Sequence, residues 1–109
     1  MNRGDIWIVD LDPTRGREQP GLRPVLILSR AEFNALGLAV IAPITTAGGQ
    51  SRTAGFHVSL QGFGLVTNGV VRCEHFRSLD VRGRQGRFAE HAPDEITDAV
   101  LAKIAAVLE

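Results

Sequence analysis

The chain has 109 residues, 44% of them hydrophobic, and its mean hydropathy of +0.04 argues against an intrinsically disordered protein. Its length predicts a single domain over residues 1–109, and its lone cysteine, Cys73, excludes an internal disulfide. The formal net charge is zero, no apolar run is long enough to span a membrane, and charged residues interrupt any signal peptide at Arg3, so we expect a cytoplasmic protein.

The predicted elements begin with strands. The apolar runs 6–11, 25–29 and 38–44 each predict a strand, the last with Pro43 near its end. Ser29 and Glu32 have the spacing of a capping box and predict a short helical turn that stops at Gly37. Segment 56–60 alternates and predicts a half-exposed strand. Segment 70–76 predicts another strand, followed by short pieces around 79–81 and 88.

The end of the chain predicts a helix. Pro93 suits its first position, and Asp94 and Glu95 suit the positive end of the helix dipole. Its apolar positions form one stripe: Ile96, Val100, Leu101, Ile104, Val107 and Leu108. The chain is therefore predicted to be mainly β with a C-terminal helix (α+β), as a small, strongly curved barrel capped by that helix, with its polar loops on one side.

The polar connection 12–24 is the most informative loop. Three prolines and two glycines exclude a regular element there, and a connection this long in a small domain is usually functional or disordered. It carries three arginines, a glutamate and a glutamine, which can bind a phosphate or a base. Residues 1–88 hold eleven arginines and no lysine, which favours phosphate recognition, although GC-rich coding would give the same excess.

Segment 69–78 places charged groups at strand spacing. On a strand, Arg72 and Glu74 point to one side, and Cys73 and His75 to the other. The pair is either a proton-transfer and charge-stabilising pair or a surface ion pair of little consequence. His57, His75 and His91 are scattered, and a solvated or packed histidine is the default interpretation of each.

Metal and nucleophile motifs are not found. No Cys/His group has zinc spacing, no acidic cluster suits a divalent metal, and no nucleophilic triad has a familiar spacing, so we expect no cofactor. Cleavage of RNA by its own 2′-hydroxyl suits this inventory, because the nucleophile belongs to the substrate. The protein then needs only a base, an acid and donors for the developing phosphorane charge.

Short motifs spread over nearly the whole chain resemble one family. They occur in the family order, at residues 3–7, 11–14, 18–19 with 21, 23–24, 33–34, 43–45, 52–56 and 69–73. Together they resemble the MazF/PemK/Kid toxins of type II toxin–antitoxin systems, and most of all the Kid/PemK branch. The resemblance implies an SH3-like small β-barrel of the MazF/PemK/CcdB type that forms a homodimer.

The resemblance also implies an activity. It is a sequence-specific, metal-independent endoribonuclease acting on single-stranded RNA, with 2′,3′-cyclic phosphate and 5′-hydroxyl products, which blocks translation and growth. The implied partner is a cognate antitoxin with a flexible acidic tail. MazF-like members use an Arg and a Thr, which match Arg23 and Thr45. Kid-like members use an Arg as acid and an Asp as base, which match Arg72 and Glu74.

Three departures from the family pattern concern this site. Glu74 replaces Asp, Arg17 replaces a histidine that assists, and His75 replaces a common Gln; His75 could restore a titratable group, although on an ideal strand it faces away from Glu74. The residues expected to bind RNA are Arg17, Glu18, Gln19, Thr46, Arg52, His75 and Arg77.

Two other functions stay open. One is a non-catalytic inhibitor of DNA gyrase of the CcdB type, because that toxin shares the barrel and a fold does not fix function. The other is a catalytically inactive interaction module, which Glu74 and Arg17 support best. Cleavage of RNA by the purified protein would separate the endoribonuclease hypothesis from both of these alternatives.

Overall fold

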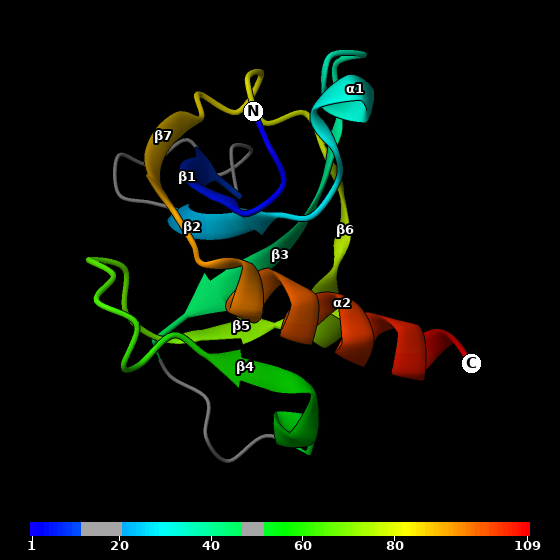
Figure 1. Ribbon diagram of the computed structural model, residues 1–109. Coiled ribbons are helices and arrows are strands. Elements are labelled where there is room, and N and C mark those ends of the chain that lie inside the picture. Colours follow the sequence, from blue (N-terminus) through cyan, green and yellow to red (C-terminus); the bar gives the residue numbers. More distant parts are fainter. Residues whose placement is uncertain (12–20, 47–51) are drawn as a thin grey trace.

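The computed structural model describes residues 1–11, 21–46 and 52–109, which form a mainly β protein with a C-terminal helix, as predicted (Figure 1). The strands are β1 (Asp5–Asp10), β2 (Leu22–Ile27), β3 (Ala39–Thr45), β4 (His57–Ser59), β5 (Val70–Arg72), β6 (Arg77–Leu79) and β7 (Arg87–His91). The helices are α1 (Ala31–Asn34) and α2 (Asp94–Leu108), with 3-10 turns η2 (Ala54–Phe56) and η3 (Cys73–His75).

The described strands form one sheet in the order β4-β5-β3-β2-β1-β7, and β6 also pairs with β3. Every pairing is antiparallel. Strand β3 has three partners in succession: its first half pairs with β6, its middle with β2 and its end with β5. The sheet must bend strongly to allow this, so segments distant in the sequence meet along β3 (Figure 1).

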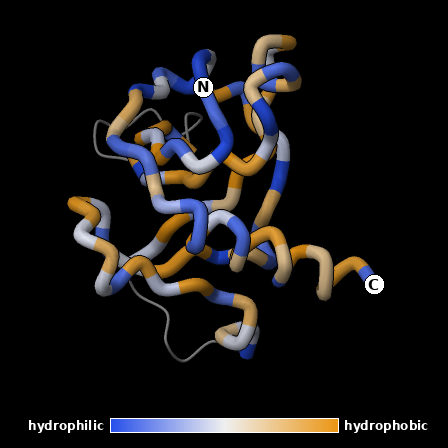
Figure 2. The backbone as a smooth tube through the Cα atoms, in the orientation of Figure 1, coloured by the Kyte–Doolittle hydropathy of each residue, from blue (hydrophilic) through white to orange (hydrophobic). Residues whose placement is uncertain are grey.

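The central strands are apolar on both sides because both sides are covered. One core cluster packs under α2 and includes Ile6, Leu26 and Ile44. A second cluster on the other side of the same strands includes Val9 and Ile27. Figure 2 shows the hydrophobic residues gathered on these central strands. Burial on two faces explains why the run in β1 does not alternate with polar residues.

The predicted helix starts were partly wrong. Ser29 does not cap α1, which begins after Arg30 with no side-chain cap. The Ser29 hydroxyl instead donates to Asn34 and accepts from the amide of Val40, so it ties the turn to β3. Pro93 lies one residue before the first residue of α2, in an extended conformation.

The apolar stripe of α2 is only partly covered. Ile96, Val100 and Ile104 are buried, and Leu101 is half-buried. Val107 and Leu108 at the end of the helix are 42% and 69% exposed. None of the helices in the described part of the chain has the length and apolarity to cross a bilayer.

Candidate nucleic-acid cleavage site

A hollow of about 240 Å³ lies where β2, β3, β5 and β6 meet. The register that pairs Val25 with Pro43 brings Arg23 and Thr45 to the same level of the sheet, and Arg77 is paired with Ile41. The hollow is lined by Leu11, Arg23, Ile41, Pro43, Ile44, Thr45, Arg72, His75 and Arg77. Three of the four predicted catalytic residues and two of those expected to bind RNA therefore share one hollow.

Positive charge dominates this hollow. Arg23 and Arg77 are exposed and Arg72 is half-buried, so three guanidinium groups border it. Nη1 of Arg23 donates a hydrogen bond to the carbonyl of Leu22 at 2.9 Å. The described lining contains no carboxylate. A phosphate is the kind of ligand that such a set of donors binds well.

Glu74 contacts Arg72 from outside the hollow, in a cluster with Thr53 and His57. Its Oε2 accepts hydrogen bonds from Thr53 Oγ1 at 2.7 Å and from Arg72 Nη2 at 3.0 Å, and it lies 3.1 Å from His57 Nε2. The Glu74 side chain is 12% exposed. The predicted contact between Arg72 and Glu74 is therefore confirmed, but the carboxylate faces the cluster and does not line the hollow.

These bonds make Glu74 a strong acid. Burial raises its pKa, but the hydrogen bonds from Thr53, from its own backbone amide, from His57 and from Arg72 outweigh burial and lower the pKa from 4.5 to about 2. The pKa of the neighbouring Cys73 thiol shifts in the opposite direction. Burial, followed by the charge of Glu74, raises the pKa of its thiol to about 11, so the thiol stays protonated at neutral pH.

The predicted strand 70–76 is confirmed only over residues 70–72. Strand β5 ends at Arg72, and residues 73–75 turn into η3, closed by the hydrogen bond from the Phe76 amide to the Cys73 carbonyl. Burial of Cys73 and the bonds that Glu74 forms with Thr53 and His57 override the local alternation. The turn also corrects the expected direction of His75: its Nε2 lies 3.9 Å from Glu74 Oε2 and 3.5 Å from Arg72 Nη2.

Sequence reasoning missed Thr53 and His57 as parts of this site. The sequence pattern predicts His57 on a half-exposed strand with no role in the site, yet its side chain is 6% exposed. What links His57 to the site is its cross-strand pairing with Arg72, and this pairing cannot be predicted until the order of the strands is known. Thr53 belongs to the motif 52–56 that carries the family resemblance, and its hydroxyl is the donor that approaches Glu74 most closely.

The remaining predicted residues lie elsewhere. Thr46 and Arg52 are exposed, and neither lines the described part of the hollow. Arg17, Glu18 and Gln19 lie outside the described residues.

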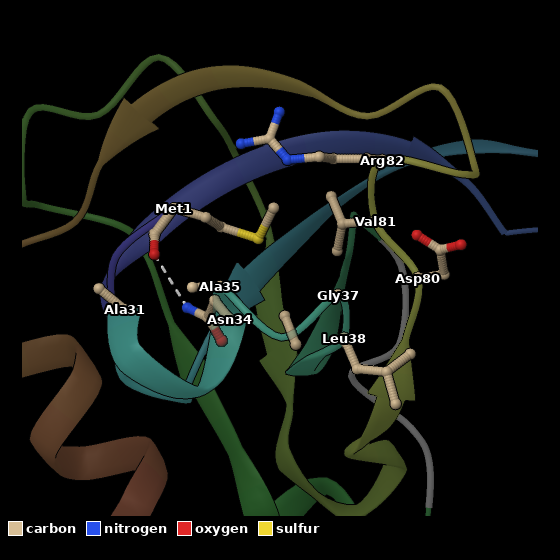
Figure 3. Close-up of a pocket in the computed structure, with 10 residues that line it drawn as sticks. Met1, Ala31, Asn34, Ala35, Gly37, Leu38, Asp80, Val81 and Arg82 are labelled. Atoms are coloured by element: carbon tan, nitrogen blue, oxygen red, sulfur yellow. Dashed lines mark hydrogen bonds between the residues drawn. The ribbon is translucent and has the colours of Figure 1, made fainter.

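A second hollow of about 380 Å³ lies between α1 and residues 80–82 (Figure 3). On one side of it, Asn34 donates a hydrogen bond to the carbonyl of Met1, and Asp80 and Arg82 lie on the other. It contains none of the predicted site residues. In the described ranges, no three His, Cys, Asp or Glu side chains are placed to hold a metal ion.

Comparison with known proteins gives the site its context. Residues 2–108 match the family model described as a PemK-like, MazF-like toxin of type II toxin–antitoxin systems. The chain is 49% identical over 109 residues to the endoribonuclease PemK of Escherichia coli, with 99% of this chain and 82% of that protein covered.

Solved structures agree with the sequence matches. The crystal structure of MazF (Form-I) from Deinococcus radiodurans superposes with a TM-score of 0.84 at 33% identity, over 99% of this chain and 96% of that one. The MazE-MazF (Form-II) structure from the same organism gives 0.82 at 29% identity, over 99% and 94%. These agreements in sequence and structure show that the chain belongs to the family of PemK-like and MazF-like toxins of type II toxin–antitoxin systems.

Proposed function

We propose that this protein is a metal-independent endoribonuclease that cleaves single-stranded mRNA at specific sequences and thereby inhibits translation and growth. Attack by the substrate's 2′-hydroxyl leaves a 2′,3′-cyclic phosphate and a 5′-hydroxyl. The observation that carries the proposal is the convergence of Arg23, Thr45 and Arg72 on one hollow of about 240 Å³. The curated relative PemK, named an endoribonuclease, supports it.

Each group has a role that its chemistry suits. Arg23 and Arg72 donate to the non-bridging oxygens of the scissile phosphate as negative charge develops, and the hydroxyl of Thr45 contributes a further polar contact. Removal of one such preorganised donor typically lowers kcat by about 10²–10³-fold. Arg77 and His75, which border the same hollow, contact the RNA on either side of the phosphate.

Glu74 acts on the reaction through Arg72. Its Oε2 accepts from both Nε and Nη2 of Arg72, at 3.3 and 3.0 Å, so the guanidinium is fixed in orientation. The cluster with Thr53 and His57 holds the carboxylate in turn. A role for Glu74 as the base itself, as the family resemblance implies, is the alternative that a Glu74→Gln variant tests.

RNA binding extends beyond the hollow. We place Thr46 and Arg52 on the path of the RNA because both are exposed, and because arginine side chains bind phosphates and stack on bases. Arg17, Glu18 and Gln19 are assigned to the same path from the family resemblance.

The partners follow from the family. A type II toxin has an antitoxin, and the three arginines at the hollow would attract the acidic tail of such a partner, which would then block the RNA site. We also propose a homodimer that works in the cytoplasm.

The test is incubation of the purified protein with mixed single-stranded RNA in EDTA, with the 5′ ends mapped and the cyclic phosphate assayed. Cleavage at a short motif that is lost in Arg23→Ala supports the proposal. Arg30→Ala is the matched control, because Arg30 is exposed and lies outside the hollow. Intact RNA at high protein concentration refutes the proposal and favours the gyrase-directed or inactive alternatives, which a supercoiling assay then separates.

A further inference from the structure

The proposed reaction needs a group that takes the proton of the 2′-hydroxyl, and we infer that this group is the imidazole of His75. The inference rests on the function proposed above. It assigns His75 a chemical step in addition to contact with RNA.

The composition of the hollow points to His75. Its other polar lining residues in the described ranges are arginines and Thr45, and the rest are Leu11 and the apolar residues of β3. Guanidinium groups keep their proton at every pH below about 12, and a threonine hydroxyl is a very weak base. Histidine is the side-chain type that changes charge between about pH 5 and pH 8, where a general base works best.

The position of His75 suits the step. Its side chain lines the hollow and is 53% exposed, so an RNA ribose can reach it. Its Nε2 lies 3.5 Å from Nη2 of Arg72, the group assigned to the phosphate. The attacking 2′-oxygen and the phosphorus are neighbours in RNA, so a base next to a phosphate donor is in the required place.

Glu74 is poorly suited to the same task. Its Oε2 already accepts hydrogen bonds from Thr53 and Arg72 and contacts His57, and its side chain is only 12% exposed. A carboxylate with a pKa of about 2 has little affinity for a proton at neutral pH. The η3 turn therefore separates two roles: Glu74 orients Arg72, and His75 lines the hollow in which the RNA is proposed to bind.

The step balances without a co-reactant other than water. The neutral imidazole accepts the proton of the 2′-hydroxyl while the O2′–P bond forms. The P–O5′ bond then breaks, its electron pair goes to O5′, and O5′ takes a proton from solvent water. The imidazolium returns its proton to solvent. Both products of the proposed function, the cyclic phosphate and the 5′-hydroxyl, result.

Charged groups surround the ring from several elements. Arg72 from β5, Arg23 from β2 and Arg77 from β6 border the same hollow, and Glu74 precedes His75 in η3. The further ionisable groups on the elements packed against η3 include His57 of β4, which contacts Glu74, and Lys103 of α2, which donates to the carbonyl of Gly55. A pH effect is therefore assigned to the ring only where it differs between His75→Gln and a control histidine variant.

The experiment measures kcat and KM on an RNA oligonucleotide that carries the mapped cleavage site, between about pH 5 and pH 9. For the wild type, kcat/KM falls toward low pH as the base is protonated. In His75→Gln, kcat falls about 10²–10⁴-fold, KM changes little and the fall at low pH disappears. Added imidazole restores part of the activity of His75→Ala. His91→Gln is the matched control, because that histidine is 51% exposed and lies outside the hollow.

The outcomes separate the two proposals. If the wild type cleaves RNA and Arg23→Ala does not, while His75→Gln keeps the wild-type kcat and pH profile, the assignment of His75 is wrong and the proposed function stands. A change in KM alone has the same meaning, because His75 then only binds RNA. If the wild type cleaves no RNA, the proposed function fails and the inference fails with it.

Discussion

Replacement of Glu74 by Gln tests how much the buried cluster stabilises the fold. The pKa of Glu74 falls from 4.5 to about 2 on folding, because hydrogen bonds from Thr53, His57 and Arg72 outweigh the burial of the carboxylate. At 1.36 kcal/mol per pH unit this corresponds to about 3 kcal/mol. Solvent screening at the edge of the cluster reduces the figure, and we expect Glu74→Gln to lower the free energy of unfolding at pH 7 by about 2 kcal/mol.

The same shift fixes the direction of the pH dependence. The folded carboxyl binds its proton less tightly than the unfolded one, so its stabilisation is fully present above about pH 4.5 and is lost as the pH falls toward 2. Urea unfolding at a fixed protein concentration measures it. Trp7, the single tryptophan, is 9% exposed and reports unfolding by fluorescence.

The control is Glu32→Gln, because Glu32 is an exposed residue of α1. It should change the free energy of unfolding by less than about 0.5 kcal/mol at every pH. The reasoning is refuted if Glu74→Gln is as stable as the control at pH 7. It is also refuted if the variant loses as much stability as the wild type between pH 7 and the acid range.

Three further substitutions or probes test other features. In Gly69→Ala, a Cβ would lie 2.2 Å from the carbonyl oxygen of Thr45 at a φ of +118°, so we expect a loss of roughly 3 kcal/mol or more by urea unfolding, and slower RNA cleavage because Thr45 moves. Cys73 is buried and its thiol pKa is about 11, so a thiol reagent at pH 7 should react only when the protein unfolds; fast labelling of folded protein would contradict this. Glu90 accepts from the amides of Val66 and Thr67, so Glu90→Gln should speed hydrogen exchange at both amides, and unchanged protection would show that other contacts hold the loop.

The sequence predicted the elements whose pattern is local. The apolar runs of β1, β2 and β3 and the stripe of α2 mark buried elements directly, and all four formed. The turn at η3 could not be found in this way. Its cause is the burial of Cys73 and the bonds from Glu74 to side chains 17 and 21 residues away, which local alternation does not contain.

The residues of the candidate site also divide into those predicted from local motifs and those that depend on the order of the strands. Arg23, Thr45 and Arg72 were predicted from motifs, and the structure places all three around one hollow. Thr53 and His57 contact Glu74 only because β4 pairs with β5, so their part in the site needed the strand order. The direction of His75 was mispredicted for a related reason, because a residue that leaves a strand for a 3-10 turn no longer obeys a period of two.

The hollow between β2, β3, β5 and β6 has a consequence for the synthesis of the protein on the ribosome. A growing chain that ends before Arg77 lacks one wall of the hollow, and β1 gains its second partner only when β7, at Arg87–His91, has emerged. The helix α2, which packs on the core cluster that includes Ile44 and Val71, follows all the described strands in the sequence. During synthesis the lining of the hollow is therefore complete only once Arg77 has been made, and α2, which begins at Asp94, can cover the core only after that.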